Sequence, residues 1–243
     1  MTERLASPSS LWSIHSAISI TTLTLCTLYL FAFDGLTEVG NLWKSPTIPL
    51  LIASELLKWF VNVKWLKLVG RPKHIPVAAY QRHEAQLVNR IKYAVNIIIT
   101  LAVFFFVYAF ACIIFGAAII EHLPGTISLS LVLVTLTVLP FVLYLGSRAT
   151  WELLFCDEFQ LTSKSQTAYL EYIQNNATAC LFGAWISSIV VPLDWDRDWQ
   201  TYPIPNVCGA MMGMAVSNGY WLLMGVGSRF TRIEKLLNRQ KSN

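Results

Sequence analysis

The chain has 243 residues, of which 55% are apolar and only 13% are charged, and its mean hydropathy is +0.52. A soluble globular domain carries about 25% charged residues, so this composition indicates a membrane-embedded chain and leaves no room for a separate water-soluble domain. The net charge of +4 comes from basic residues that flank apolar segments. Because they form no single broad stripe, nucleic acid is not expected as a partner.

Five segments are apolar over about 20 residues, the length that a helix needs to cross a bilayer. They are residues 13–33, 94–120, 126–145, 172–191 and 207–226. The first is longer than the apolar core of a signal peptide and lacks a small-residue cleavage site, so we expect a permanent span. The excess length of the second predicts either tilt or an end that protrudes into water. A turn at Pro124-Gly125 should join the second to the third, which Pro140 should kink.

A sixth segment, residues 47–69, is ambiguous. Glu55, Lys58 and Asn62 are spaced so that they share one helical face. This pattern is typical of an amphipathic helix lying at the membrane surface, and also of a span that turns a polar stripe toward the protein interior.

The distribution of basic residues favours a span. With six spans and a cytosolic N-terminus, all but three of the 18 basic residues lie on the cytosolic side. The exceptions are Lys44 and Arg197 on the far side and Lys58 within the membrane. Because cytosolic loops carry an excess of lysine and arginine, we predict an all-α integral membrane protein with about six transmembrane helices and both termini in the cytosol. Residues 1–243 then form one multispanning domain.

The cysteines predict no disulfide framework. Four of the five lie within or at the edges of apolar segments, and no pair has C-x-x-C spacing. We interpret them as small apolar residues of the protein interior.

An acidic, aromatic turn, residues 192–205, should join the last two spans outside the membrane. It carries three aspartates, one arginine, two tryptophans, a tyrosine and three prolines, so its rings are expected at the level of the lipid headgroups. Asp194, Asp196 and Asp198 could bind a divalent cation, but their spacing is loose. Helix capping, solvation or pairing with Arg197 is the simpler interpretation.

The chain has no metalloprotease, serine-elbow or phosphate-loop motif, so we assign no catalytic, cofactor-binding or metal-binding residue.

The last two spans each carry small residues at every fourth position. These are Ala179, Gly183 and Ser187 in one span, and Gly209, Gly213 and Ser217 in the other. Small residues on one ridge let helix backbones approach closely, which favours association in lipid. Either the two ridges pack against each other as an internal hairpin, or they form a groove for another subunit.

Several motifs in the C-terminal half match a known family. They are Phe182-Gly183-Ala184-Trp185, Pro192-Leu193-Asp194-Trp195-Asp196-Arg197, Trp199-Gln200, Pro203-Ile204-Pro205 and Gly209-Ala210 with Gly213. Together they resemble the signature of the PIG-F family, whose members are small multispanning subunits of glycosylphosphatidylinositol (GPI) anchor synthesis. The N-terminal half agrees in span pattern and length.

The resemblance implies a non-catalytic subunit of the endoplasmic reticulum membrane, without a cofactor. Its partners would be larger transferases that add phosphoethanolamine to mannoses of the GPI precursor. The residues expected to contact a partner are Asp194, Trp195, Asp196, Arg197, Trp199, Gly183, Gly209 and Gly213. The alternative is a lipid-handling transferase or flippase acting directly on headgroups, which should line several spans with polar residues at one depth.

Overall fold

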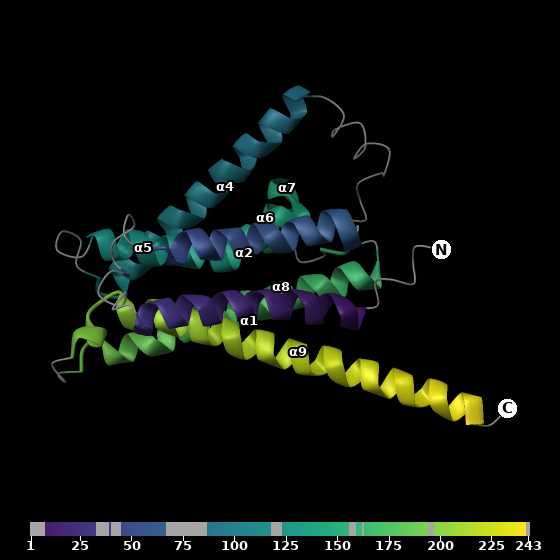
Figure 1. The fold of residues 1–243 in the computed structure, drawn as a ribbon. Helices are drawn as coiled ribbons and strands as arrows, with labels where there is room; N and C mark the ends of the chain where they lie inside the picture. Colours follow the sequence, from purple (N-terminus) through teal and green to yellow (C-terminus); the bar gives the residue numbers. More distant parts are fainter. Residues whose placement is uncertain are drawn as a thin grey trace.

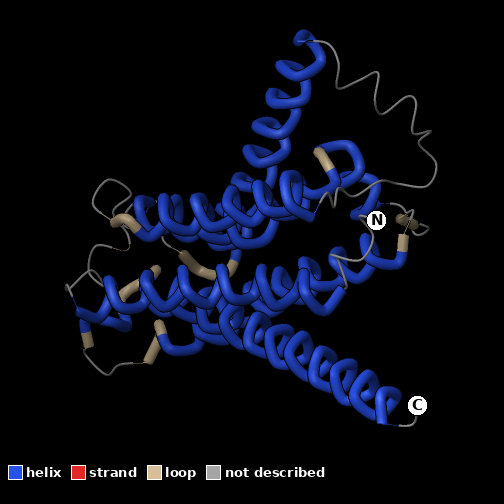
Figure 2. Tube along the Cα trace, turned by 45° about the vertical axis from the view of Figure 1, so that its right-hand side comes forward, coloured by secondary structure: helices blue, strands red, loops and turns tan. Residues whose placement is uncertain are grey.

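The computed structural model describes residues 8–32, 39, 45–66, 87–117, 123–155, 159–161, 163–193 and 197–241. The regular elements in these ranges are helices (Figure 2). The all-α prediction is therefore confirmed for the described part of the chain.

The main helices form two layers that run side by side (Figure 1). One layer contains α1 (Pro8–Ala32), α8 (Lys164–Ser187) and the first half of α9 (Ile204–Lys241). The other contains α2 (Thr47–Val61) with its π-helical extension Asn62–Leu66, and the broken helix α5 (Leu123–Leu133), Val134–Val138 and α6 (Leu139–Leu145). The long helix α4 (Leu87–Ile114) leans against the second layer at an angle, near the short α7 (Ser147–Phe155).

Four helical segments are long and apolar enough to cross a membrane: Trp12–Ala32, Ile91–Ile114, Leu123–Leu145 and Ile204–Gly227. They correspond to four of the predicted spans and identify a multi-pass membrane protein. Helix α4 is inclined to the other long helices (Figure 1), while its tilt relative to the membrane stays a prediction.

The other two predicted spans are also helical, but α2 has only 15 residues and α8 is more polar than the apolar spans. Helix α2 carries the charged pair Glu55 and Lys58. Helix α8 begins at Lys164 and includes Glu171, Gln174 and a pair of asparagines before its apolar end. The count of six spans and the orientation of the termini therefore stay predictions.

Two predicted breaks look different in the structure. Pro124 and Gly125 lie in the first turn of α5 instead of a loop, where proline is tolerated because the first N–H groups of a helix have no intrahelical acceptor. Pro140 follows the π-helical turn Val134–Val138. A widened turn of this kind accommodates the carbonyl that a proline leaves without a donor.

The core lies where the two layers meet. It joins Leu23, Cys26 and Leu30 of α1, Leu51 of α2, Leu129 and Leu136 of the broken helix, and Val207, Met211 and Met214 of α9. Cys26 and Cys180 are fully buried and, like Cys112 and Cys208, are free thiols. This agrees with their interpretation as small apolar residues; Cys156 lies outside the described residues.

Candidate functional site

The glycine ridges of α8 and α9 pack against each other. A β-carbon added to Gly183 would collide with the carbonyl oxygen of Gly209, and one added to Gly213 would collide with the carbonyl oxygen of Ala179. At Gly209 the added carbon would meet the Ser187 hydroxyl. Of the two arrangements open from the sequence, the internal hairpin is the one that the structure contains. That these glycines also contact a transferase stays a prediction.

Side-chain hydrogen bonds fix both ends of this hairpin. Ser163 precedes α8, and its hydroxyl accepts a bond from the Gln166 N–H (3.3 Å), the usual role of an N-cap serine. At the other end the Asn206 amide donates to the Ala184 carbonyl (3.1 Å). The register of α8 against α9 is therefore specified by polar contacts as well as by close packing.

The turn between α8 and α9 is organised by Gln200, which is buried. Its side-chain amide donates to the Val190 and Leu193 carbonyls at 3.2 and 2.5 Å, and its oxygen accepts from the Arg197 N–H at 3.3 Å. Arg197 and Trp199 are exposed, as a contact surface at this position requires. Asp194, Trp195 and Asp196 lie outside the described residues.

Tyr202 connects this turn to the broken helix. Its phenol and the Thr126 hydroxyl lie 3.1 Å apart, and burial raises the pKa of Tyr202 above its ordinary value. The phenol is therefore neutral at physiological pH. Gly125 allows the close approach, since a β-carbon there would lie 2.9 Å from Pro203 Cδ.

A shallow, open hollow of about 280 Å³ lies on the same turn. It is lined by Val191, Leu193, Arg197, Asp198, Gln200 and Thr201. The opposite charges of Arg197 and Asp198 suit a small polar group more than a metal ion. In the described part of the chain, no three histidine, cysteine or acidic side chains converge as metal ligands.

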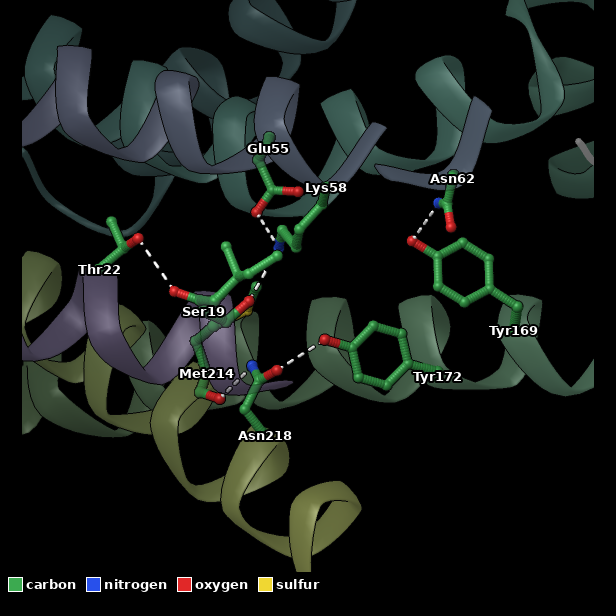
Figure 3. A network of polar contacts seen from close by, with 10 residues as sticks. Ser19, Thr22, Glu55, Lys58, Asn62, Tyr169, Tyr172, Met214 and Asn218 are labelled. Atoms are coloured by element: carbon green, nitrogen blue, oxygen red, sulfur yellow. Dashed lines mark hydrogen bonds and ion pairs between the residues drawn. The ribbon is translucent and has the colours of Figure 1, made fainter. Parts of the chain in front are cut away.

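The most extensive polar cluster lies between the layers (Figure 3). Lys58 of α2 donates to Glu55 at 2.5 Å and to the Ser19 hydroxyl of α1 at 2.9 Å. Both charged side chains are only 4% exposed. The inward-facing stripe is thus the arrangement that the structure contains, and the pair is neutralised within the protein.

Two further hydrogen-bonded chains extend this cluster to α8 and α9. His15 Nε2 donates to the Asn62 side-chain oxygen, and Asn62 Nδ2 donates to the Tyr169 hydroxyl, both at 2.8 Å. The Tyr172 hydroxyl donates to the Asn218 side-chain oxygen at 2.7 Å. We call this cluster the interlayer network: His15, Ser19, Glu55, Lys58, Asn62, Tyr169, Tyr172 and Asn218.

Of the interlayer network, the sequence pattern indicated the polar stripe Glu55, Lys58 and Asn62. Tyr169 lies just before the predicted span 172–191, and Tyr172 is its first residue. Their helical spacing with Asn176 was the available signal that these polar side chains share one face of the helix. Asn218 lies one position from the small-residue ridge. Which helices these side chains would join depends on tertiary packing, which the sequence pattern does not specify.

Comparisons with known proteins point to one family. Residues 13–220 match the model described as GPI biosynthesis protein family Pig-F. The chain is 31% identical over 101 residues to the mouse (Mus musculus) protein named GPI ethanolamine phosphate transferase, stabilizing subunit; the match covers 42% of this chain and 44% of the mouse protein. No solved structure matches the chain significantly.

Fungal relatives carry a related name. Glycosylphosphatidylinositol anchor biosynthesis protein 11 of Pyricularia oryzae is 32% identical over 107 residues, covering 44% of this chain and 37% of the relative. The protein of the same name in Candida glabrata is 60% identical over 38 residues, which cover 16% of this chain and 18% of the relative. In all three relatives the aligned segment is less than half of the protein. The family model nevertheless covers most of this sequence, and the chain belongs to the Pig-F family of GPI biosynthesis proteins.

Proposed function

We propose that this chain is a non-catalytic subunit that stabilises GPI ethanolamine phosphate transferases in the endoplasmic reticulum membrane. The observation that carries the proposal is the family match over residues 13–220, together with the name of the mouse relative. The interlayer network supports it, because its polar groups bond to one another and hold helices together instead of facing a substrate.

Partner binding is expected at surfaces outside the α8–α9 contact. The predicted interface residues of the turn, Asp194, Trp195, Asp196, Arg197 and Trp199, belong to this proposal. Arg197 and Trp199 are exposed beside the hollow on the turn, which supports their role. Gly183, Gly209 and Gly213 would contribute indirectly, because they set the geometry of the hairpin that carries the turn.

The proposed topology has six spans with both termini in the cytosol. Helix α2 runs alongside the broken helix α5–α6, and α8 runs alongside α1 and α9 (Figure 1). Their charged or amide side chains on the inner face are buried by neighbouring helices. A helix packed in this way crosses a membrane with polar residues that an isolated span would not tolerate. The turn after α8 would then face the lumen.

The rival function, direct handling of lipid headgroups, would require polar side chains from several helices at one depth. The interlayer network does bring together side chains of α1, α2, α8 and α9. A headgroup path, however, needs those groups to line water, whereas here they are buried and pair with each other at 2.5–2.9 Å. The assembly function is therefore the better account.

The proposal is tested by removing the chain from its own cells and measuring the transferases. We expect their abundance to fall several-fold, and GPI precursors lacking phosphoethanolamine to accumulate. Re-expression of the tagged chain should restore both and recover a transferase in mild detergent. Transferases that stay abundant and active without this chain would contradict the proposal.

A further inference from the structure

The outer face of α8 has a composition that lipid does not favour. Glu171, Gln174, Asn175 and Thr178 are all exposed, and their spacing of three and four residues places them on one side of the helix. We call these four residues the α8 polar face. Further along the same side the exposed residues are apolar, including Phe182 and Trp185.

Contacts with α9 show how deep the α8 polar face lies. The Tyr172 hydroxyl bonds to Asn218, and its ring packs against Trp221 with centroids 5.9 Å apart. About two turns further along α8, the backbone at Ala179 contacts Gly213 of α9. Residues 172–179 therefore lie beside residues 213–221, inside the apolar span Ile204–Gly227 and away from both its ends. The α8 polar face is at the depth of the hydrocarbon.

Two exposed threonines of α1 show how a polar side chain at membrane depth is satisfied within its own helix. On α1, the Thr24 and Thr27 hydroxyls each donate to the carbonyl four residues earlier, at 2.8 Å, so a threonine can face lipid with its donor bonded. A carboxamide has two N–H donors and an acceptor oxygen, and a carboxylate has two acceptor oxygens, so one bond to the backbone of the same helix does not satisfy either group. Within the described residues, none of the four side chains of the α8 polar face forms a hydrogen bond.

We infer that the α8 polar face binds a transmembrane helix of the partner, one that presents hydrogen-bonding side chains at the same depth. This inference rests on the proposed function, which supplies the transferase as that partner. The partner helix would carry amides or hydroxyls opposite Gln174 and Asn175, and a basic residue opposite Glu171. Toward Trp185 it would become apolar, to match the change in character along α8.

A second copy of this chain fits the surface less well. A two-fold axis normal to the membrane would place α8 against α8, with Glu171 beside its own equivalent. Two carboxylates at that depth repel each other. From residue 98 to residue 110 the exposed side chains of α4, including Ile98, Phe106 and Phe110, are apolar. The chemistry therefore favours a different protein over self-association.

The test replaces the amides with residues that lipid favours. Q174L/N175L raises the apolar character of α8, so membrane insertion should be retained. We expect the amount of co-purified transferase to fall about tenfold, as the loss of one or two interhelical hydrogen bonds implies. The matched control is T21L/T24L on the exposed side of α1, which should leave recovery unchanged.

A photo-crosslinking side chain at position 178 identifies the occupant directly. We expect a covalent adduct with a transferase, and none from the same group at position 106 on α4. Unchanged recovery with Q174L/N175L, or adducts at 178 only with lipid or a second copy of this chain, would overturn the inference and leave the proposed function intact. Failure of the wild-type chain to recover any transferase would instead contradict the proposed function, and the inference with it.

Discussion

Helices α2 and α8 carry similar polar patterns and use them in opposite directions. On α2, Glu55, Lys58 and Asn62 face inward and bond to α1 and α8. On α8, Gln174 and Asn175 face outward. Neither helix is among the four segments that are both long and apolar enough to cross a membrane, since α2 has only 15 residues and α8 is the more polar of the two.

The difference separates two uses of polarity in a membrane. Inward-facing groups that bond to one another hold the layers together without a partner, while outward-facing groups at membrane depth need another protein to satisfy them. Helix α8 carries both kinds, with Tyr172 inward and Gln174 outward. On the proposed account it would couple the folding of this chain to the binding of a partner.

The largest effect is expected from the hairpin that supports the α8 polar face. Gly209→Leu places bulk against the Gly183 backbone and Ser187, where even a β-carbon would collide. The whole α8–α9 contact must open to accommodate it, so the loss exceeds the roughly 1–3 kcal/mol typical of overpacking in a core. Folded protein in detergent, measured by size-exclusion chromatography, should largely disappear. Gly219→Leu is the control, because a β-carbon at Gly219 meets nothing within 4 Å. Equal yields of the two variants would show that the α8–α9 contact is not tight.

A smaller but clear effect is expected within the interlayer network. Lys58→Met leaves Glu55 buried without its cation. Removing one partner of a buried ion pair destabilises a protein by about 3–5 kcal/mol. The temperature of unfolding in detergent should fall markedly. Glu55→Met/Lys58→Met removes both charges, so it should recover most of that loss. If the double variant is no more stable than the single one, the pair does not act as a self-neutralising unit.

The smallest effect concerns one hydrogen bond between α8 and α9. Tyr172→Phe removes the donor to Asn218, and interhelical bonds in membranes contribute about 0.6 kcal/mol on average. A slight fall in the unfolding temperature is expected, with normal recovery of the transferase. Tyr220→Phe on the exposed side of α9 provides the comparison and should have no effect. A loss of transferase recovery with Tyr172→Phe alone would contradict the claim that inward-facing residues of α8 serve folding and outward-facing residues serve partner binding.

The helical class and the four apolar spans could be predicted from hydrophobic length alone. Small residues at every fourth position also predicted close packing of the last two spans, although they could not indicate whether the contact was internal. Two features could not be predicted from hydrophobic length or residue spacing. The partners of Asn62 and Asn218 depend on which helices become neighbours, and the first turn of α5 shows that Pro-Gly can begin a helix when proline occupies its first positions.

The outer face of α8 illustrates the same limit. Gln174 and Asn175 were visible in the sequence only as residues near the edge of a span. Their depth became evident through the contacts of Tyr172 and Ala179 with α9. Their exposure, in turn, depends on which side of α8 the neighbouring helices cover.

The central claim is that α8 crosses the membrane beside α9, because the depth of its polar face depends on it. The direct measurement is labelling of single added cysteines with a membrane-impermeant reagent at Ser163, which precedes α8, and at Asp198, in the turn between α8 and α9; both positions are exposed. The parent protein with its native cysteines gives the background. In sealed microsomes we expect labelling at 163 from the cytosolic side, and at 198 only after the lumen is opened. Labelling of both positions from the same side would contradict the account.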